Sequence, residues 1–101
     1  MWNQSNRIRC VLLVCATIAT TSTFAANPDQ GENLVKRWCA GCHFVAADQK
    51  SARTDAPTFA SVAARPDFDP AKLAFFLLDP HPKMLSRDEA SDIAAYIATL
   101  K

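Results

Sequence analysis

Residues 37–43 read RWCAGCH, and this stretch governs how the rest of the chain is interpreted. Two cysteines, Cys39 and Cys42, lie three positions apart, and His43 follows directly. Cysteine pairs at this spacing form half of a zinc site, a redox-active thiol pair or, when a histidine follows, a covalent attachment point for haem. The surrounding sequence therefore has to distinguish three different chemistries.

Residues 1–25 have the features of a secretory signal peptide. Arg7 and Arg9 precede the apolar run of residues 10–20, and small residues lead to a predicted cleavage site after Ala25. The apolar run, about 11 residues long, is shorter than the roughly 20 that a membrane-spanning helix needs. We therefore expect no permanent membrane anchor, and a mature periplasmic domain of residues 26–101.

The composition is that of one small soluble domain, with 50% hydrophobic and 21% charged residues in a chain of 101. Removing 25 of the 101 residues leaves 76, in which nine basic residues face ten acidic ones. This net charge of about −1 gives no reason to expect nucleic acid as a partner. A domain of this size usually needs disulfides, a metal or a cofactor for stability, and only one cysteine pair remains to provide it.

The segment before the cysteine pair has the pattern of an amphipathic helix. Asn27 is suited to the N-cap and Pro28 to the first helical position. Apolar or small residues then share one face at the spacing of a helix, ending at Trp38. Gly31 on this face indicates either close approach by another backbone or simple tolerance of one glycine, and the residues alone do not decide between them.

Further helices are predicted downstream, and no stretch alternates as a strand does. Asp69 with Pro70 starts one, and Ser86 with Glu89 forms a capping box for a terminal helix from about Arg87 to Leu100. A shorter helical turn is expected within residues 58–64. The class is therefore all-α. The apolar faces are interpreted as ordinary core: Leu34, Val35 and Trp38; Leu73, Phe76 and Leu77; Ile93, Tyr96, Ile97 and Leu100.

A zinc site and a thiol-redox site both fit poorly around the cysteine pair. A structural zinc site takes four ligands, and the only later candidate in this chain is His81. Thiol-disulfide oxidoreductases usually carry such a pair after a strand, at a helix N-terminus that lowers the thiol pKa. Here the pair ends a predicted helix, whose dipole would raise the thiol pKa. The thiol oxidoreductase remains the less favoured alternative.

Covalent haem suits the same residues better. Cys39 and Cys42 lie one helical turn apart, so both sulfurs can face one side and form thioethers with the two haem vinyl groups. His43 can then turn its imidazole to the iron as the proximal ligand. A large apolar macrocycle also provides the core that 76 residues struggle to build.

With these residues the mature chain resembles the class I cytochrome c family, in particular its small bacterial periplasmic members. The resemblance covers GENL (31–34), WCAGCH (38–43), APTF (56–59), HPKM (81–84) and IAAYIATL (93–100). It implies N- and C-terminal helices that cross around one covalently bound haem c, near Gly31.

The resemblance also implies two further roles. The carbonyl of Pro57 would accept a hydrogen bond from His43 and set its tautomer, and Met84 would be the distal axial ligand. One departure from the family is that Leu85 leads directly into Ser86 and its predicted cap, so the distal loop is short. A packed loop position for Met84, and His81 as the other conventional ligand nearby, therefore stay open.

The expected function is that of a one-electron carrier between a donor dehydrogenase or reductase and an acceptor such as an oxidase, with covalent haem supplied by attachment machinery. We expect no enzymatic activity of its own, whether as a free shuttle or as the haem subunit of a larger oxidoreductase. Lys36, Arg37 and Lys83 indicate either a docking surface for an acidic partner or an ordinary solvated surface. A haem enzyme or gas sensor with an open distal site is the alternative from another class.

Overall fold

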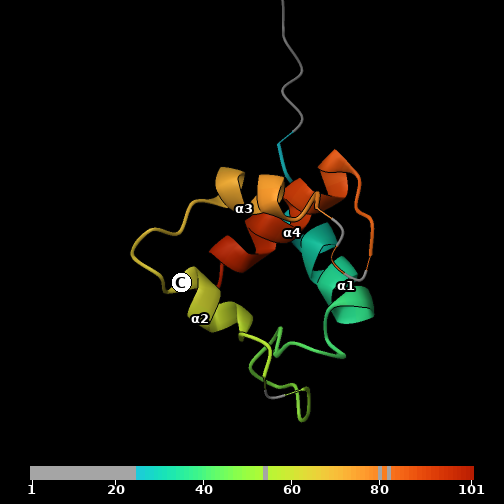
Figure 1. Cartoon of the computed structure of the whole chain (residues 1–101), viewed down its shortest axis with the longest axis vertical. Coiled ribbons are helices and arrows are strands. Elements are labelled where there is room, and N and C mark those ends of the chain that lie inside the picture. Colours follow the sequence, from blue (N-terminus) through green and yellow to red (C-terminus); the bar gives the residue numbers. More distant parts are fainter. Residues whose placement is uncertain (1–24, 54, 80, 82) are drawn as a thin grey trace, which may run out of the picture.

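The computed structural model describes residues 25–53, 55–79, 81 and 83–101. Within these residues the chain forms four helices, α1 (Pro28–Trp38), α2 (Phe59–Ala63), α3 (Pro70–Phe76) and α4 (Arg87–Ala98), and no strand. The other three helices all contact α4, which lies at the centre of the molecule in Figure 1. The predicted all-α class is confirmed. The predicted signal peptide, apart from Ala25, lies outside the described residues.

Helix α1 begins where its sequence predicts. The side chain of Asn27 accepts hydrogen bonds from the backbone N–H groups of Asp29 at 3.0 Å and Gln30 at 3.1 Å. These bonds satisfy two of the donors that a helix leaves free at its first turn. Pro28 lacks an N–H and its fixed φ suits the helix, so the cap and the proline together define this end.

The crossing of α1 and α4 depends on Gly31. A Cβ atom placed on Gly31 would lie 1.9 Å from the carbonyl oxygen of Asp92 in α4. This contact decides between the two interpretations of the glycine, because only a residue without a side chain allows the two backbones to approach so closely. The side chain of Asp92 also accepts a hydrogen bond from the N–H of Asn27 at 2.7 Å, which joins the start of α1 to the middle of α4.

Helix α4 begins with the predicted capping box. The Ser86 hydroxyl accepts from the Glu89 N–H at 3.1 Å, and the Glu89 carboxylate accepts from the Ser86 N–H at 3.0 Å. The helix ends at Ala98, slightly before the predicted Leu100, because Thr99 caps it and the Thr99 hydroxyl donates to the Tyr96 carbonyl at 2.6 Å. Its buried face consists of Ala90, Ile93, Ala94, Tyr96 and Ile97.

The buried core lies mainly between α1, α4 and the segment that follows the cysteine pair. Val35 of α1 and Val45 of that segment pack with the buried face of α4. The Tyr96 hydroxyl donates to the Val45 carbonyl at 2.5 Å, so a residue 51 positions away in sequence fixes the segment against α4. The predicted core positions on α1 and α4 are confirmed for Leu34, Val35, Ile93, Tyr96 and Ile97.

Helix α3 differs from this core. None of its residues is buried, and Phe75 and Phe76 are 78% and 60% exposed. The interpretation as ordinary core is therefore wrong for Phe76, whereas Leu73 and Leu77 are half-buried and pack against the core. The face that these three residues form lies partly against α4 and partly against a cavity.

Candidate haem site

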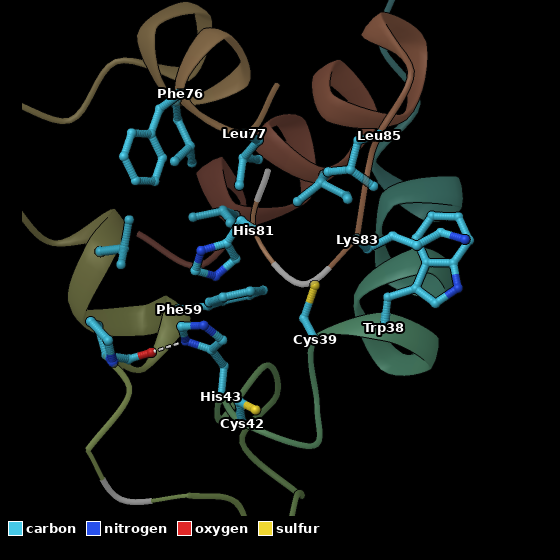
Figure 2. A pocket seen from close by; sticks show the side chains of 15 residues that line it. Trp38, Cys39, Cys42, His43, Phe59, Phe76, Leu77, His81, Lys83 and Leu85 are labelled. Atoms are coloured by element: carbon cyan, nitrogen blue, oxygen red, sulfur yellow. Dashed lines mark hydrogen bonds between the residues drawn. The ribbon is translucent and has the colours of Figure 1, made fainter. Parts of the chain in front are cut away.

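A cavity of about 280 Å³ lies between α4, α3, α2 and the end of α1 (Figure 2). This volume is close to the lower end of the range for small-molecule and cofactor sites. Phe76 lines the cavity and is well exposed, so the cavity reaches the protein surface. Its lining is mostly apolar: Trp38, Cys39, Cys42, His43, Pro57, Phe59, Val62, Leu73, Phe76, Leu77, His81, Lys83, Leu85, Ile93 and Ile97.

Both cysteines and the adjacent histidine line this one cavity. Cys39 caps α1, and its carbonyl accepts hydrogen bonds from the N–H groups of Cys42 at 3.1 Å and His43 at 2.9 Å. The turn formed by these bonds reverses the chain after α1, so that Cys39 before the turn and Cys42 and His43 after it all line the cavity. Two sulfurs and one imidazole are therefore available to a single group placed there.

The orientation of His43 is set by the segment before α2. Its Nδ1 lies 2.5 Å from the carbonyl oxygen of Pro57, and since a carbonyl can only accept, Nδ1 is the protonated nitrogen. Nε2 then keeps its lone pair for a metal, the tautomer that a histidine ligand needs. The ring also packs beside Phe59, with 5.0 Å between the ring centroids.

Gln49 organises the loop after the cysteine pair, although no sequence motif marks this residue. The two hydrogens of its amide nitrogen are shared among the carbonyls of Ala40 at 2.8 Å, His43 at 2.8 Å and Ser51 at 3.0 Å. Its amide oxygen accepts from the Val45 N–H at 2.8 Å. One side chain thus joins four points of the backbone around the turn that carries His43, through bonds to residues two to nine positions away.

The raised pKa of the Cys39 thiol argues against a role in disulfide exchange. Burial, and to a smaller extent the neighbouring Cys42, raises the pKa of the Cys39 thiol from its usual 9.0 to about 11. We expected the helix dipole to raise this pKa, but burial is the main cause. A thiol with such a pKa is almost entirely protonated at neutral pH, whereas disulfide exchange requires the thiolate.

The opposite wall of the cavity is formed by the segment before α4. His81, Lys83 and Leu85 line the cavity, and the His81 ring faces the His43 ring with 6.0 Å between the centroids (Figure 2). Met84, the predicted distal ligand, is 80% exposed and is not part of the lining. Of the residues singled out in the sequence, five border the cavity: Cys39, Cys42, His43, Pro57 and His81. Met84 does not border it.

Two of the three cations near the cysteine pair are engaged with neighbouring side chains. The Lys36 ammonium lies 2.8 Å from the Glu32 carboxylate, which also raises the pKa of Lys36. The Lys83 ammonium lies 4.5 Å from the centre of the Trp38 ring, a cation–π contact. The charge of Lys36 is therefore largely neutralised by Glu32. The charge of Lys83 contacts the Trp38 ring, which links the segment before α4 to α1.

Comparison with known proteins identifies the family. The chain is 57% identical, over 96 residues, to cytochrome c-552 of Bradyrhizobium diazoefficiens, and the match covers 91% of each chain. It belongs to the class I c-type cytochromes. No family model matches the chain, and no solved structure does.

Family membership makes this cytochrome an electron-transfer protein with covalently bound haem c as its cofactor. The cavity fits that group. It offers an apolar wall for the macrocycle, two cysteine side chains on its lining and an imidazole whose Nε2 has no hydrogen-bond role in holding the ring. Among the described residues, no helix has both the length and the apolar character that crossing a membrane requires.

Proposed function

We propose that this cytochrome is a periplasmic mono-haem carrier, which accepts one electron from a dehydrogenase or reductase and passes it to an acceptor protein. The observation that carries the proposal is that Cys39, Cys42 and His43 line one apolar cavity while Pro57 holds the proton of His43 on Nδ1. When bound there, the haem supplies a single iron that alternates between the ferrous and ferric states.

The proposed attachment uses both thiols of the cavity. Each S–H group of Cys39 and Cys42 adds across one vinyl group, so that the sulfur bonds to one vinyl carbon and a hydrogen is placed on the other. This addition needs no oxidant or reductant. We assign it to the cell's haem-attachment machinery, because the raised pKa of Cys39 makes the free thiol a weak nucleophile at neutral pH.

The protein's own contribution is orientation and exclusion of water. The Pro57 carbonyl and Phe59 fix the plane of the His43 ring, and the apolar wall from α2, α3 and α4 lowers the polarity around the iron. The cavity opens beside the exposed Phe76, which is where we place the haem edge that exchanges electrons with partner proteins.

Export and removal of residues 1–25 are part of the proposal. Ala25 and Ala26 are exposed, and the N–H of Asn27 is hydrogen bonded to Asp92. Cleavage after Ala25 would leave Asn27, the N-cap of α1, in the mature chain. Residues 26–101 would then act as a free shuttle or as the haem subunit of a larger oxidoreductase.

The test is production of the full chain in a host with haem-attachment machinery, followed by intact mass and a redox titration. We expect a mass increase of one haem, cleavage after Ala25 and a one-electron titration. Cys39→Ser and Cys42→Ser should each lose one thioether, and the double variant should lose covalent haem. Gly41→Ala is the matched control within the same motif, because nothing lies within 4 Å of the added Cβ. A protein without covalent haem whose two thiols titrate freely would contradict the proposal.

A further inference from the structure

Three consecutive carbonyl groups, beginning with that of His43, are held from three different parts of the chain. The His43 carbonyl accepts a hydrogen bond from the side chain of Gln49 at 2.8 Å. The next carbonyl accepts from the N–H of the first residue of α2 at 2.9 Å, and the one after it accepts from the hydroxyl of Tyr96 in α4. Of these three bonds, the one from Gln49 holds the backbone of the histidine itself.

Gln49 also closes the turn that carries Cys42 and His43. Its amide nitrogen lies 2.8 Å from the Ala40 carbonyl oxygen, and its amide oxygen accepts from the Val45 N–H at 2.8 Å. Ala40 precedes these two residues in the sequence and Val45 follows them. One half-buried side chain therefore fixes the backbone on both sides of the turn.

The ring of His43 is held by a different part of the chain, through the bond from its Nδ1–H to the Pro57 carbonyl at 2.5 Å (dashed in Figure 2). A hydrogen bond weakens steeply when its angle or length departs from the optimum. Two side-chain torsions connect the ring to the backbone, so a displacement of the backbone moves the ring away from Pro57. The two bonds thus act in series: Gln49 fixes the backbone, and Pro57 then fixes the ring and its proton.

We propose that Gln49 is a positioning residue for the iron ligand, which holds the His43 backbone so that the bond from Nδ1–H to Pro57 stays short. The inference rests on the proposed attachment of haem at Cys39, Cys42 and His43. A strong hydrogen bond from Nδ1–H makes the imidazole a more basic ligand. A more basic ligand favours ferric over ferrous iron, so Gln49 lowers the reduction potential of the cytochrome. It acts through His43, since within the described part of the chain it lies outside the lining of the cavity.

The experiment compares Gln49→Met with the wild type, both purified with covalent haem. Methionine is close to glutamine in length and has no N–H donor. We expect a higher reduction potential in a redox titration. We also expect the His43 Nδ1 proton, followed by NMR in the ferrous protein, to exchange with solvent several-fold faster. Asn27→Ala is the control, because it removes the cap of α1 and lowers stability without changing the loop, so it should keep both wild-type values.

A second variant, Gln49→Glu, keeps the test decisive if Gln49→Met does not fold. Glutamate retains an oxygen for the Val45 N–H but has no N–H group for the carbonyls of Ala40 and His43. The His43 Nδ1 proton should exchange faster in this variant as well. Proton exchange alone is compared here, because the added negative charge changes the potential directly.

Two results would overturn the inference. Wild-type exchange of the His43 Nδ1 proton in the Gln49 variants, whatever their stability or potential, would show that Gln49 stabilises the loop without positioning the ligand. Loss of covalent haem in both Gln49 variants, with Asn27→Ala fully loaded, would assign Gln49 to haem attachment instead. Failure of the proposed function would look different, because the wild type would also carry no covalent haem.

Discussion

The two sides of α4 are built in different ways. On the side that faces α1 there is no room for even a methyl group, since a Cβ on Gly31 would lie 1.9 Å from the Asp92 carbonyl oxygen. On the side that faces α3 lies a cavity of about 280 Å³, and α3 contributes no buried residue. The comparison shows that the chain alone completes one half of the fold, whereas the other half needs the cofactor.

The same contrast appears in the hydrogen bonds. Around α1 and the loop that follows it, Asn27 and Tyr96 join segments far apart in sequence, and Gln49 holds the loop itself together. The proximal side, which carries His43, is therefore organised by the polypeptide itself. The cavity side depends on apolar contact, and the hydrophobic effect stabilises it fully only when a macrocycle covers those side chains.

Removal of the haem should have the largest effect and should separate the two sides. In the Cys39→Ser, Cys42→Ser double variant we expect amides of α3 to lose most of their protection against exchange with solvent, while those of α1 and α4 keep most of theirs. The reason is that α3 loses its contact with the macrocycle and keeps only its contact with α4. Hydrogen exchange followed by mass spectrometry measures this, with the haem-loaded protein as the control. Equal protection of α1 and α3 would show that the cavity side is stable on its own.

Gly31→Ala should have the next largest effect, on the crowded side. The added Cβ must displace the backbone of α4, so we expect a loss of about 3 kcal/mol in the free energy of unfolding, at the upper end of the cost of overpacking. Urea denaturation of the haem-loaded protein gives the value. Gly41→Ala is the control, since its Cβ meets nothing within 4 Å. If the two variants were equally stable, the crossing would not be as tight as described.

The smallest expected effect is on the pH dependence of stability, through the capping box at the start of α4. Hydrogen bonds from Ser86 hold the pKa of Glu89 below its usual 4.5. The ionised carboxylate is thus favoured in the folded state, so its contribution to stability is present above about pH 4.5 and is lost as the pH falls through the lowered pKa. Melting temperatures at pH 7 and pH 3.5 should fall less for Glu89→Gln than for the wild type. An identical fall in both proteins would mean that other carboxylates account for the acid sensitivity.

Local signals in the sequence were sufficient to predict where α1 and α4 begin, but not which parts of the protein these helices contact. Asn27 and Ser86 cap their own helices through bonds to residues two or three positions away, so the sequence shows both ends. The role of Gly31 was undecided because it depends on Asp92, which is distant in the sequence. Phe76 of α3 was misread because the apolar pattern does not reveal whether a side chain is buried in the core or lines an open cavity.

The candidate site divides in the same way. Cys39, Cys42 and His43 are adjacent in the sequence, and their motif placed them correctly on one cavity. Met84 was predicted as the distal ligand from the likeness of HPKM (81–84) to the family's distal loop, but this likeness does not give the direction of its side chain, which is 80% exposed. Such directions depend on contacts that form only when the chain folds.

Gln49 has a consequence for the chemical lifetime of the protein. Its amide N–H groups serve three carbonyls and its oxygen serves the Val45 N–H. Hydrolysis of this amide to a carboxylate would remove the donors and leave an anion facing the three carbonyl oxygens, each of which can only accept. A single deamidation event, at a residue that does not border the cavity, would then loosen the loop that positions His43.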